Sequence, residues 1–112
     1  NYTDEELAEI FDIMMKKEQY EYSSSIRVCI VEFFRKLKEN SNPSSFGNAR
    51  EVRNAYGDLK KIQAKRIYSS KNFKNKGKQL LVKITNNDIE NLYSRHGFEL
   101  KKSNRLKKGE GK

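Results

Sequence analysis

At 112 residues the chain has room for one domain with a modest core, and too little for a second. Its single cysteine excludes an internal disulfide and favours a reducing, cytoplasmic location, and no apolar run reaches the ~18 residues of a membrane span. The net charge of +9 admits nucleic acid as a partner, so the distribution of that charge matters. Because the chain opens on a helix-capping pattern and not on Met, we expect it to be a piece of a longer protein.

The positive charge is concentrated in two segments. Residues 60–83 carry nine basic side chains and no acidic one, and residues 101–112 carry a net charge of +5, whereas residues 1–59 sum to −3. This pattern is typical of a solvated helix end and of a basic, disordered tail, here residues 99–112. We favour that interpretation and keep a nucleic-acid or acidic-partner surface as the alternative.

Two helices are predicted in the first part of the chain. Thr3 opens a Thr-Asp-Glu-Glu capping box, and apolar residues at helical spacing then predict a helix over about residues 4–18. Ser24 or Ser25 can cap a second helix over about residues 25–40. This second helix has a wide apolar stripe, and we expect it to be the most buried. The stripe comprises Ile26, Cys29, Ile30, Phe33, Phe34 and Leu37.

A third helix follows the loop over residues 39–45, which contains the only proline. We expect Asn48 to cap this helix, Glu51 to complete a capping box, and the helix to run to about Tyr68. Gly57 lies inside the helix and should cost about 1 kcal/mol relative to alanine. The positions expected to face the core are Val52, Ala55, Tyr56, Leu59, Ile62 and Ile67.

The start of the third helix is suited to binding an anion. Gly47, Asn48 and Ala49 form this helix start, where free N–H groups and the helix dipole favour negative charge. Arg50 lies in the first turn, where a cation opposes the dipole, so its presence there indicates an anionic partner. Taken alone, a surface arginine is the simpler interpretation. Arg53 lies about one turn further along, as a second anion contact or in a local salt bridge.

The end of the chain predicts a small strand and a short helix. Residues 80–84 are an apolar run too short for a helix, with residues 20–22 as the expected partner strand. Thr85 and Asp88 should cap a fourth helix, which Gly97 should end. Four amphipathic helices joined by short connections predict a small all-α bundle, with room for a minor two-stranded β element.

The chain lacks the residues of a nucleotide-hydrolysing site. Gly77-Lys78 is followed by Gln79 and has no earlier glycine at the spacing of a phosphate-binding loop. His96 is the only histidine, which excludes His-based metal clusters, and we expect it to be solvated at a helix end. Cys29 is expected to be a buried, inert thiol. We therefore expect no metal site in this chain and no enzymatic activity of its own.

A series of motifs runs through the chain in a recognisable order. They are Phe46-Gly47-Asn48-Ala49-Arg50, Val52-Arg53-Asn54, Gln63-Ala64, Arg66-Ile67 and Ile84-Thr85 with Asp88-Ile89, preceded by an opening segment from Tyr2 to Phe11. In this order and spacing they resemble the C-terminal lid of the AAA+ ATPases related to red-type rubisco activase and the stage V sporulation protein K. The resemblance spans about residues 2–92. The chain departs from it at Glu51, where the family usually has a large apolar residue, and at Gly57.

The resemblance implies a four-helix lid over residues 1–98 that packs over ATP, with its Mg²⁺, bound to a separate Walker-type domain of the same chain. It makes Arg50 the sensor-2 arginine that contacts the phosphates, supported by Gly47, Asn48 and Ala49. It makes Arg53 a second phosphate contact or a contact to a neighbouring subunit. It also implies that the parent is an ATPase whose subunits form a ring, usually a hexamer, without nucleic acid or a membrane.

Two other functions stay open on the residues alone. One is a small basic helical module that binds nucleic acid through residues 60–83 and the tail, and the other is a protein-interaction bundle with no ligand. Tight, salt-sensitive binding of DNA by this chain would favour the first alternative over a lid. Gln63 and Arg66 are expected to be structural, bonding within the bundle or to the Walker-type domain.

Overall fold

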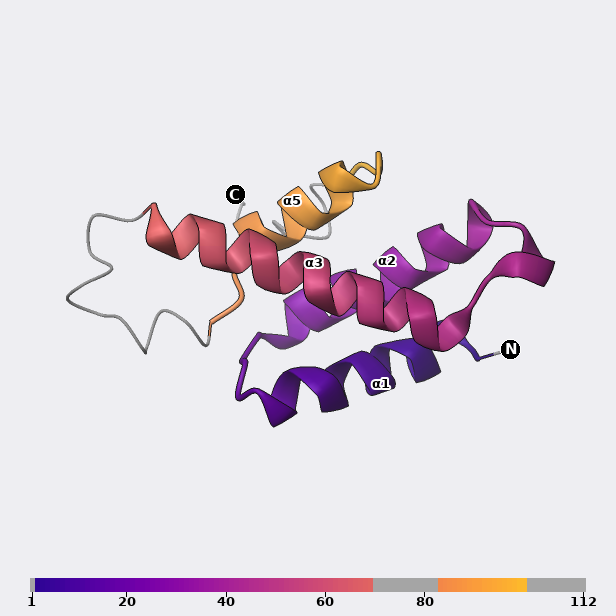
Figure 1. Ribbon diagram of the computed structural model, residues 1–112, viewed down its shortest axis with the longest axis horizontal. Helices are drawn as coiled ribbons and strands as arrows, with labels where there is room; N and C mark the ends of the chain where they lie inside the picture. The colour runs from indigo at the N-terminus through magenta and orange to yellow at the C-terminus, as the bar shows by residue number, and fades with distance from the viewer. Residues whose placement is uncertain (1, 70–82, 101–112) are drawn as a thin grey trace.

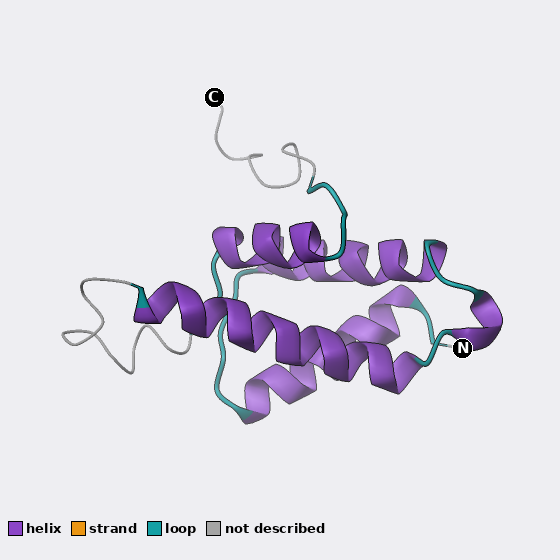
Figure 2. Cartoon of the chain, turned by 45° about the horizontal axis from the view of Figure 1, so that its top comes forward, coloured by secondary structure: helices purple, strands orange, loops and turns teal. Residues whose placement is uncertain are grey.

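The computed structural model describes residues 2–69 and 83–100, and these form a bundle of α-helices (Figure 1). In chain order the helices are α1 (Asp4–Lys17), α2 (Ser24–Glu39), α3 (Asn48–Tyr68) and α5 (Asn86–Arg95), with a one-turn 3-10 helix, η1 (Pro43–Ser45), before α3. The described residues contain no strand (Figure 2), so the predicted all-α fold is confirmed. None of these helices is long and apolar enough to cross a membrane.

Each helix of the bundle packs mainly against two others. α1 contacts α2 and α3, and α5 contacts α3 and α2, so the core lies between all four (Figure 1). In α2 every residue of the predicted apolar stripe is buried. Each large apolar side chain buried in this way contributes roughly 1.5–3 kcal/mol. The largest buried apolar side chains are Leu7, Phe11, Met15, Ile30, Phe33, Phe34, Leu59, Ile67, Ile89, Leu92 and Tyr93.

Two helices begin at the predicted capping boxes. At α1, Thr3 Oγ1 accepts a bond from the Glu6 N–H at 3.1 Å, while the Glu6 carboxylate accepts from the Thr3 N–H at 2.8 Å. At α5, Thr85 and Asp88 form the same reciprocal pair at 3.3 and 3.0 Å. Gly97 follows α5 with a φ of 76°, the left-handed conformation that glycine adopts readily, so the predicted end of this helix is confirmed.

The predicted cap of α2 is wrong by one or two residues. Ser23, and not Ser24 or Ser25, caps the helix, through a 3.2 Å bond from the Ile26 N–H. All three serines have the chemistry that a cap needs. The backbone decides between them, because Ser23 is extended, with φ −75° and ψ 168°, while the following residues are already helical.

Asn48 is not the cap of α3 that the sequence predicts. The cap is Gly47, whose carbonyl oxygen accepts a bond from the Glu51 N–H at 2.8 Å and which has no side chain to offer. Asn48 is therefore the first residue of the helix, a position from which its side chain does not cap. The predicted capping box with Glu51 is wrong for the same reason. The preceding Phe46 is buried in the core, which fixes where the chain turns into the helix.

The predicted pairing of residues 20–22 with residues 80–84 is observed at one position. Glu21 and Lys83 form an isolated parallel bridge, and the Ile84 N–H donates to the Glu21 carbonyl oxygen at 2.9 Å. Residues 80–82 lie outside the described part of the chain, as do residues 101–112 of the predicted tail. Leu100 packs against the core, so the chain still contacts the bundle beyond residue 98.

Candidate functional site

The loop before α3 is fixed by a side chain near its start and by a buried ring at its end. Asn42 Oδ1 accepts bonds from the Ser44 N–H at 3.0 Å and from the Ser44 hydroxyl at 2.9 Å, which shapes η1. Phe46 is buried against the bundle. Gly47 then caps α3 with φ −95° and ψ 97°. Because this φ is negative, the position does not need a glycine for backbone reasons.

Gly47 makes room for the side chain of Arg50. A Cβ atom at Gly47 would lie 2.7 Å from Cζ and Nη1 of Arg50, well inside van der Waals contact. The guanidinium is therefore folded back over the residue that precedes the helix. The Arg50 side chain is 56% exposed, and its Nη2 lies 3.5 Å from Glu51 Oε2. An accessible guanidinium thus lies beside the first N–H groups of α3, an arrangement suited to binding a phosphate.

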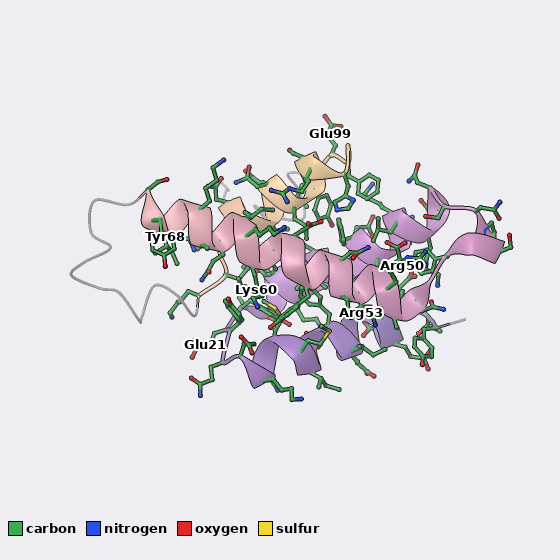
Figure 3. The ribbon with its side chains drawn as sticks, viewed as in Figure 1. Glu21, Arg50, Arg53, Lys60, Tyr68 and Glu99 are labelled. Atoms are coloured by element: carbon green, nitrogen blue, oxygen red, sulfur yellow. The ribbon has the colours of Figure 1, made fainter. Side chains whose placement is uncertain are left out.

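The other residues predicted for this site surround Arg50 in different ways. Asn48 is half-buried, whereas Ala49 and Arg53 are exposed. Arg50 and Arg53 both lie near the start of α3 (Figure 3), about 4.5 Å apart along the helix axis. The local salt bridge considered for Arg53 is not found among the described residues. Arg53 therefore presents a second cation at the same end of the helix.

A polar network far from Arg50 joins α3 to α5. Nε and Nη2 of Arg66 donate to the two carboxylate oxygens of Asp88 at 2.7 and 3.0 Å. Nε2 of Gln63 and Nη2 of Arg66 both donate to the carbonyl oxygen of Lys83, at 3.1 and 3.2 Å. Asp88 is completely buried and also caps α5 by accepting from the Thr85 N–H. The prediction that Gln63 and Arg66 bond within the bundle is confirmed.

A second network joins α1 to α2 around Asp12. The carboxylate of Asp12 accepts from the Tyr22 hydroxyl at 2.5 Å and from Arg27 Nε at 2.9 Å. Nη1 of the same arginine donates to Glu5 at 2.9 Å. Burial and the hydrogen bond to Asp12 raise the pKa of the Tyr22 hydroxyl above its ordinary value. These polar groups hold the first two helices together.

Cys29 and His96 occupy structural positions. Cys29 is buried, as predicted, and its carbonyl oxygen accepts from the Tyr93 hydroxyl at 2.6 Å. His96 ends α5, as predicted, but it is not simply solvated. Its ring packs edge-on against Phe33 with centroids 5.1 Å apart, and its Nε2 lies 3.2 Å from Asp58. Within the part of the chain that the structure describes, no three His, Cys, Asp or Glu side chains are placed to hold a metal ion.

The fold and the helix start together define a small helical bundle with an exposed arginine in the first turn of α3. A family model described as an AAA lid domain matches residues 3–98. The chain therefore belongs to the AAA lid domain family, the helical lids of AAA+ proteins. The resemblance inferred from the motifs is confirmed at this level.

Two curated proteins align with nearly two thirds of the chain. The "Protein CfxQ homolog" of Trieres chinensis is 35% identical over 71 residues, which are 63% of this chain and 23% of that protein. The "Protein CfxQ homolog" of Galdieria sulphuraria is 35% identical over 72 residues, 64% of this chain and 23% of that protein. The chain thus aligns with less than a quarter of the length of these relatives. No solved structure gives a significant match.

Proposed function

We propose that this chain is the lid of an AAA+ ATPase and closes over Mg·ATP bound to a separate Walker-type domain of the same protein. The observation that carries the proposal is the exposed guanidinium of Arg50, folded over Gly47 at the start of α3. Arg50 acts as the sensor-2 arginine, and Gly47, Asn48 and Ala49 supply the helix start that supports it. Membership of the lid family supports the proposal independently of this geometry.

The chemistry of Arg50 suits the terminal phosphates of a nucleotide. A guanidinium donates two parallel hydrogen bonds to phosphate oxygens, and the N–H groups of the helix start add to the positive potential. ATP, bound with Mg²⁺ by the Walker-type domain, supplies the phosphates. ATP and ADP present different phosphate charges to Arg50. Hydrolysis would therefore change the free energy of the closed state, and with it the angle between the lid and the Walker-type domain.

The proposed lid works as one part of a larger assembly. Its partners are the Walker-type domain of the same chain and the neighbouring subunits of a ring, which we propose to be a hexamer in the cytoplasm. Arg53, exposed one turn beyond Arg50, contacts either the phosphates or the neighbouring subunit. This function requires neither nucleic acid nor a membrane.

The proposal is tested by replacing Arg50 in the full-length ATPase. Arg50→Ala should lower kcat for ATP hydrolysis by about 10²-fold or more, because a charged contact to the reacting phosphates is lost. Arg50→Lys should recover only part of that loss, because an ammonium lacks the bidentate geometry. Since the Arg50 side chain is 56% exposed, the thermal unfolding of the 112-residue chain should hardly change.

Lys61→Ala is the matched control. Lys61 is an exposed cation of the same helix and makes no hydrogen bond or ion pair with the described residues. Its replacement should leave turnover unchanged. If Arg50→Ala also leaves turnover unchanged, Arg50 is not the phosphate sensor.

A further inference from the structure

The groove between α3 and α5 is lined by cations and amides. The two helices lie side by side (Figure 1), and the groove between them has a volume of about 470 Å³. Among the described residues that line it, none carries a carboxylate. The residues that matter here are Ile62, Lys65, Arg66, Asn87, Asn91 and Arg95.

The charges of the groove lie at its two ends. Arg66 meets Asp88 near the start of α5, and Arg95 meets Asp58 at its end, so the two helices run antiparallel along the groove. Residues 87, 91 and 95 are four apart and form one face of α5, which spans about 12 Å. Lys65, Arg66 and Asn87 therefore lie toward one end of the groove and Arg95 toward the other, with Asn91 between them.

Several polar side chains that line the groove have donors and acceptors that the described residues do not use. Lys65 is exposed and forms no hydrogen bond or ion pair with the described residues, and the same is true of the Asn87 and Asn91 side chains. Asp88 engages Nε and Nη2 of Arg66, which holds the guanidinium fixed. Arg95 is 45% exposed and lies 3.4 Å from Asp58, a distance at which the pair is weak.

We propose that this groove binds an acidic peptide segment in an extended conformation. An extended chain rises about 3.3 Å per residue, so carboxylates four residues apart span about 13 Å and match the two cationic ends. The side-chain amides of Asn87 and Asn91 each offer both donors and an acceptor, which suits the N–H and C=O groups of a peptide backbone. A phosphate group offers acceptors almost exclusively, and it would leave the amide oxygens of Asn87 and Asn91 without donors.

The undescribed parts of this chain lack the acidic residues that such a peptide needs. Residues 70–82 carry four lysines and no acid, and residues 101–112 carry six basic side chains and one acid. Charge complementarity therefore requires another chain or another region of a longer one. Arg66 lies 16 residues beyond Arg50 along α3, about 24 Å away, so the groove is separate from the phosphate-sensing site and the inference does not rest on it.

The test uses the 112-residue chain and a fluorescein-labelled peptide, Asp-Ser-Val-Ser-Asp, with both ends blocked. Binding is followed by fluorescence anisotropy at 0.15 M salt, and the side-chain amide signals of Asn87 and Asn91 are followed by NMR. We expect both amide signals to shift on titration. Lys65→Gln and Arg95→Gln should each weaken binding about two- to fivefold, the range expected for exposed ion pairs. The matched control Lys61→Gln, which removes a cation of α3 outside the groove, should leave binding unchanged.

Several results would overturn the inference. The blocked peptide Asn-Ser-Val-Ser-Asn must bind more weakly than its acidic counterpart. Equal binding of the two peptides would show that the groove does not recognise the carboxylates. If Lys61→Gln lost as much peptide affinity as the Lys65 and Arg95 variants, binding would depend only on the overall charge of the chain and not on the groove. Tripolyphosphate that binds more tightly than the peptide, and loses affinity in the Lys65 and Arg95 variants, would assign the groove to phosphate instead. Absence of measurable peptide binding would also reject the proposal.

Discussion

The position of the Arg50 guanidinium depends on a neighbour that has no side chain. Gly47 has a backbone conformation open to other residues, so its role is to let the guanidinium approach to 2.7 Å of the place where a Cβ would stand. Glu51 adds an ion pair at 3.5 Å. Because Arg50 is more than half exposed, such a pair contributes less than about 1 kcal/mol, and a phosphate can compete for the guanidinium.

Gly47→Ser should displace Arg50 without weakening the helix. Serine is a good N-cap, so the free energy of unfolding should stay the same or rise by about a few tenths of a kcal/mol. The new Cβ would stand 2.7 Å from Arg50 Cζ, so the guanidinium must move. The Nε–H resonance of Arg50 in the NMR spectrum of the 112-residue chain reports that movement, and turnover of the full-length ATPase should fall with it.

Gly47→Ala separates capping from positioning. It introduces the same Cβ without a capping oxygen, so it should shift the same resonance while lowering the stability of the chain by up to about 1 kcal/mol. An Arg50 resonance that stays in place in both variants would show that Gly47 does not position the guanidinium.

At the scale of the helices, local patterns predicted most of the fold, because most of the signals lie within four residues of one another. The capping boxes that begin at Thr3 and Thr85 could be predicted from the sequence for this reason. The cap of α2 could not be predicted in this way, because any of three consecutive serines can serve as an N-cap and only the backbone conformation selects Ser23. At α3 the rule favoured Asn48 as the cap, but the burial of Phe46 places the cap one residue earlier, at Gly47.

Gly57→Ala should stabilise α3. Gly57 lies in the middle of the helix, and a Cβ added there would meet no atom within 4 Å. The substitution should therefore raise the free energy of unfolding by about 0.5–1 kcal/mol, which urea denaturation of the 112-residue chain measures. Gly97→Ala is the matched control, because a φ of 76° strains any residue with a Cβ, and it should destabilise the chain. A loss of stability in Gly57→Ala would mean that this glycine has a packing role that the fold does not show.

At the scale of the whole molecule, the attachment of α5 lies beyond what local patterns predict. The cap formed by Thr85 and Asp88 could be predicted from the local sequence. The ion pair of Asp88 with Arg66 could not, because it joins residues that are 22 positions apart. The burial of Asp88, which is 0% exposed, could be known only once α3 and α5 were placed. The phosphate-sensing role of Arg50 likewise depends on a partner domain and stays a prediction, whereas the position of the residue at the start of α3 is established.

Asp88→Asn should therefore loosen the whole bundle and not only one helix end. The amide keeps the shape and one acceptor oxygen, but it leaves the half-buried guanidinium of Arg66 without its counter-charge. We expect a loss of about 2–3 kcal/mol, or about 10–20 °C in Tm for a chain of this size, measured by circular dichroism. Asp58→Asn removes another acid that joins α3 to α5. Because Asp58 is 26% exposed where Asp88 is 0% exposed, and because its partner Arg95 is 45% exposed, this substitution should cost less than about 1 kcal/mol. If the two variants lost the same small amount, the Arg66–Asp88 pair would not be what fastens α5 to the bundle, and apolar packing of residues such as Leu92 and Tyr93 would suffice to hold it.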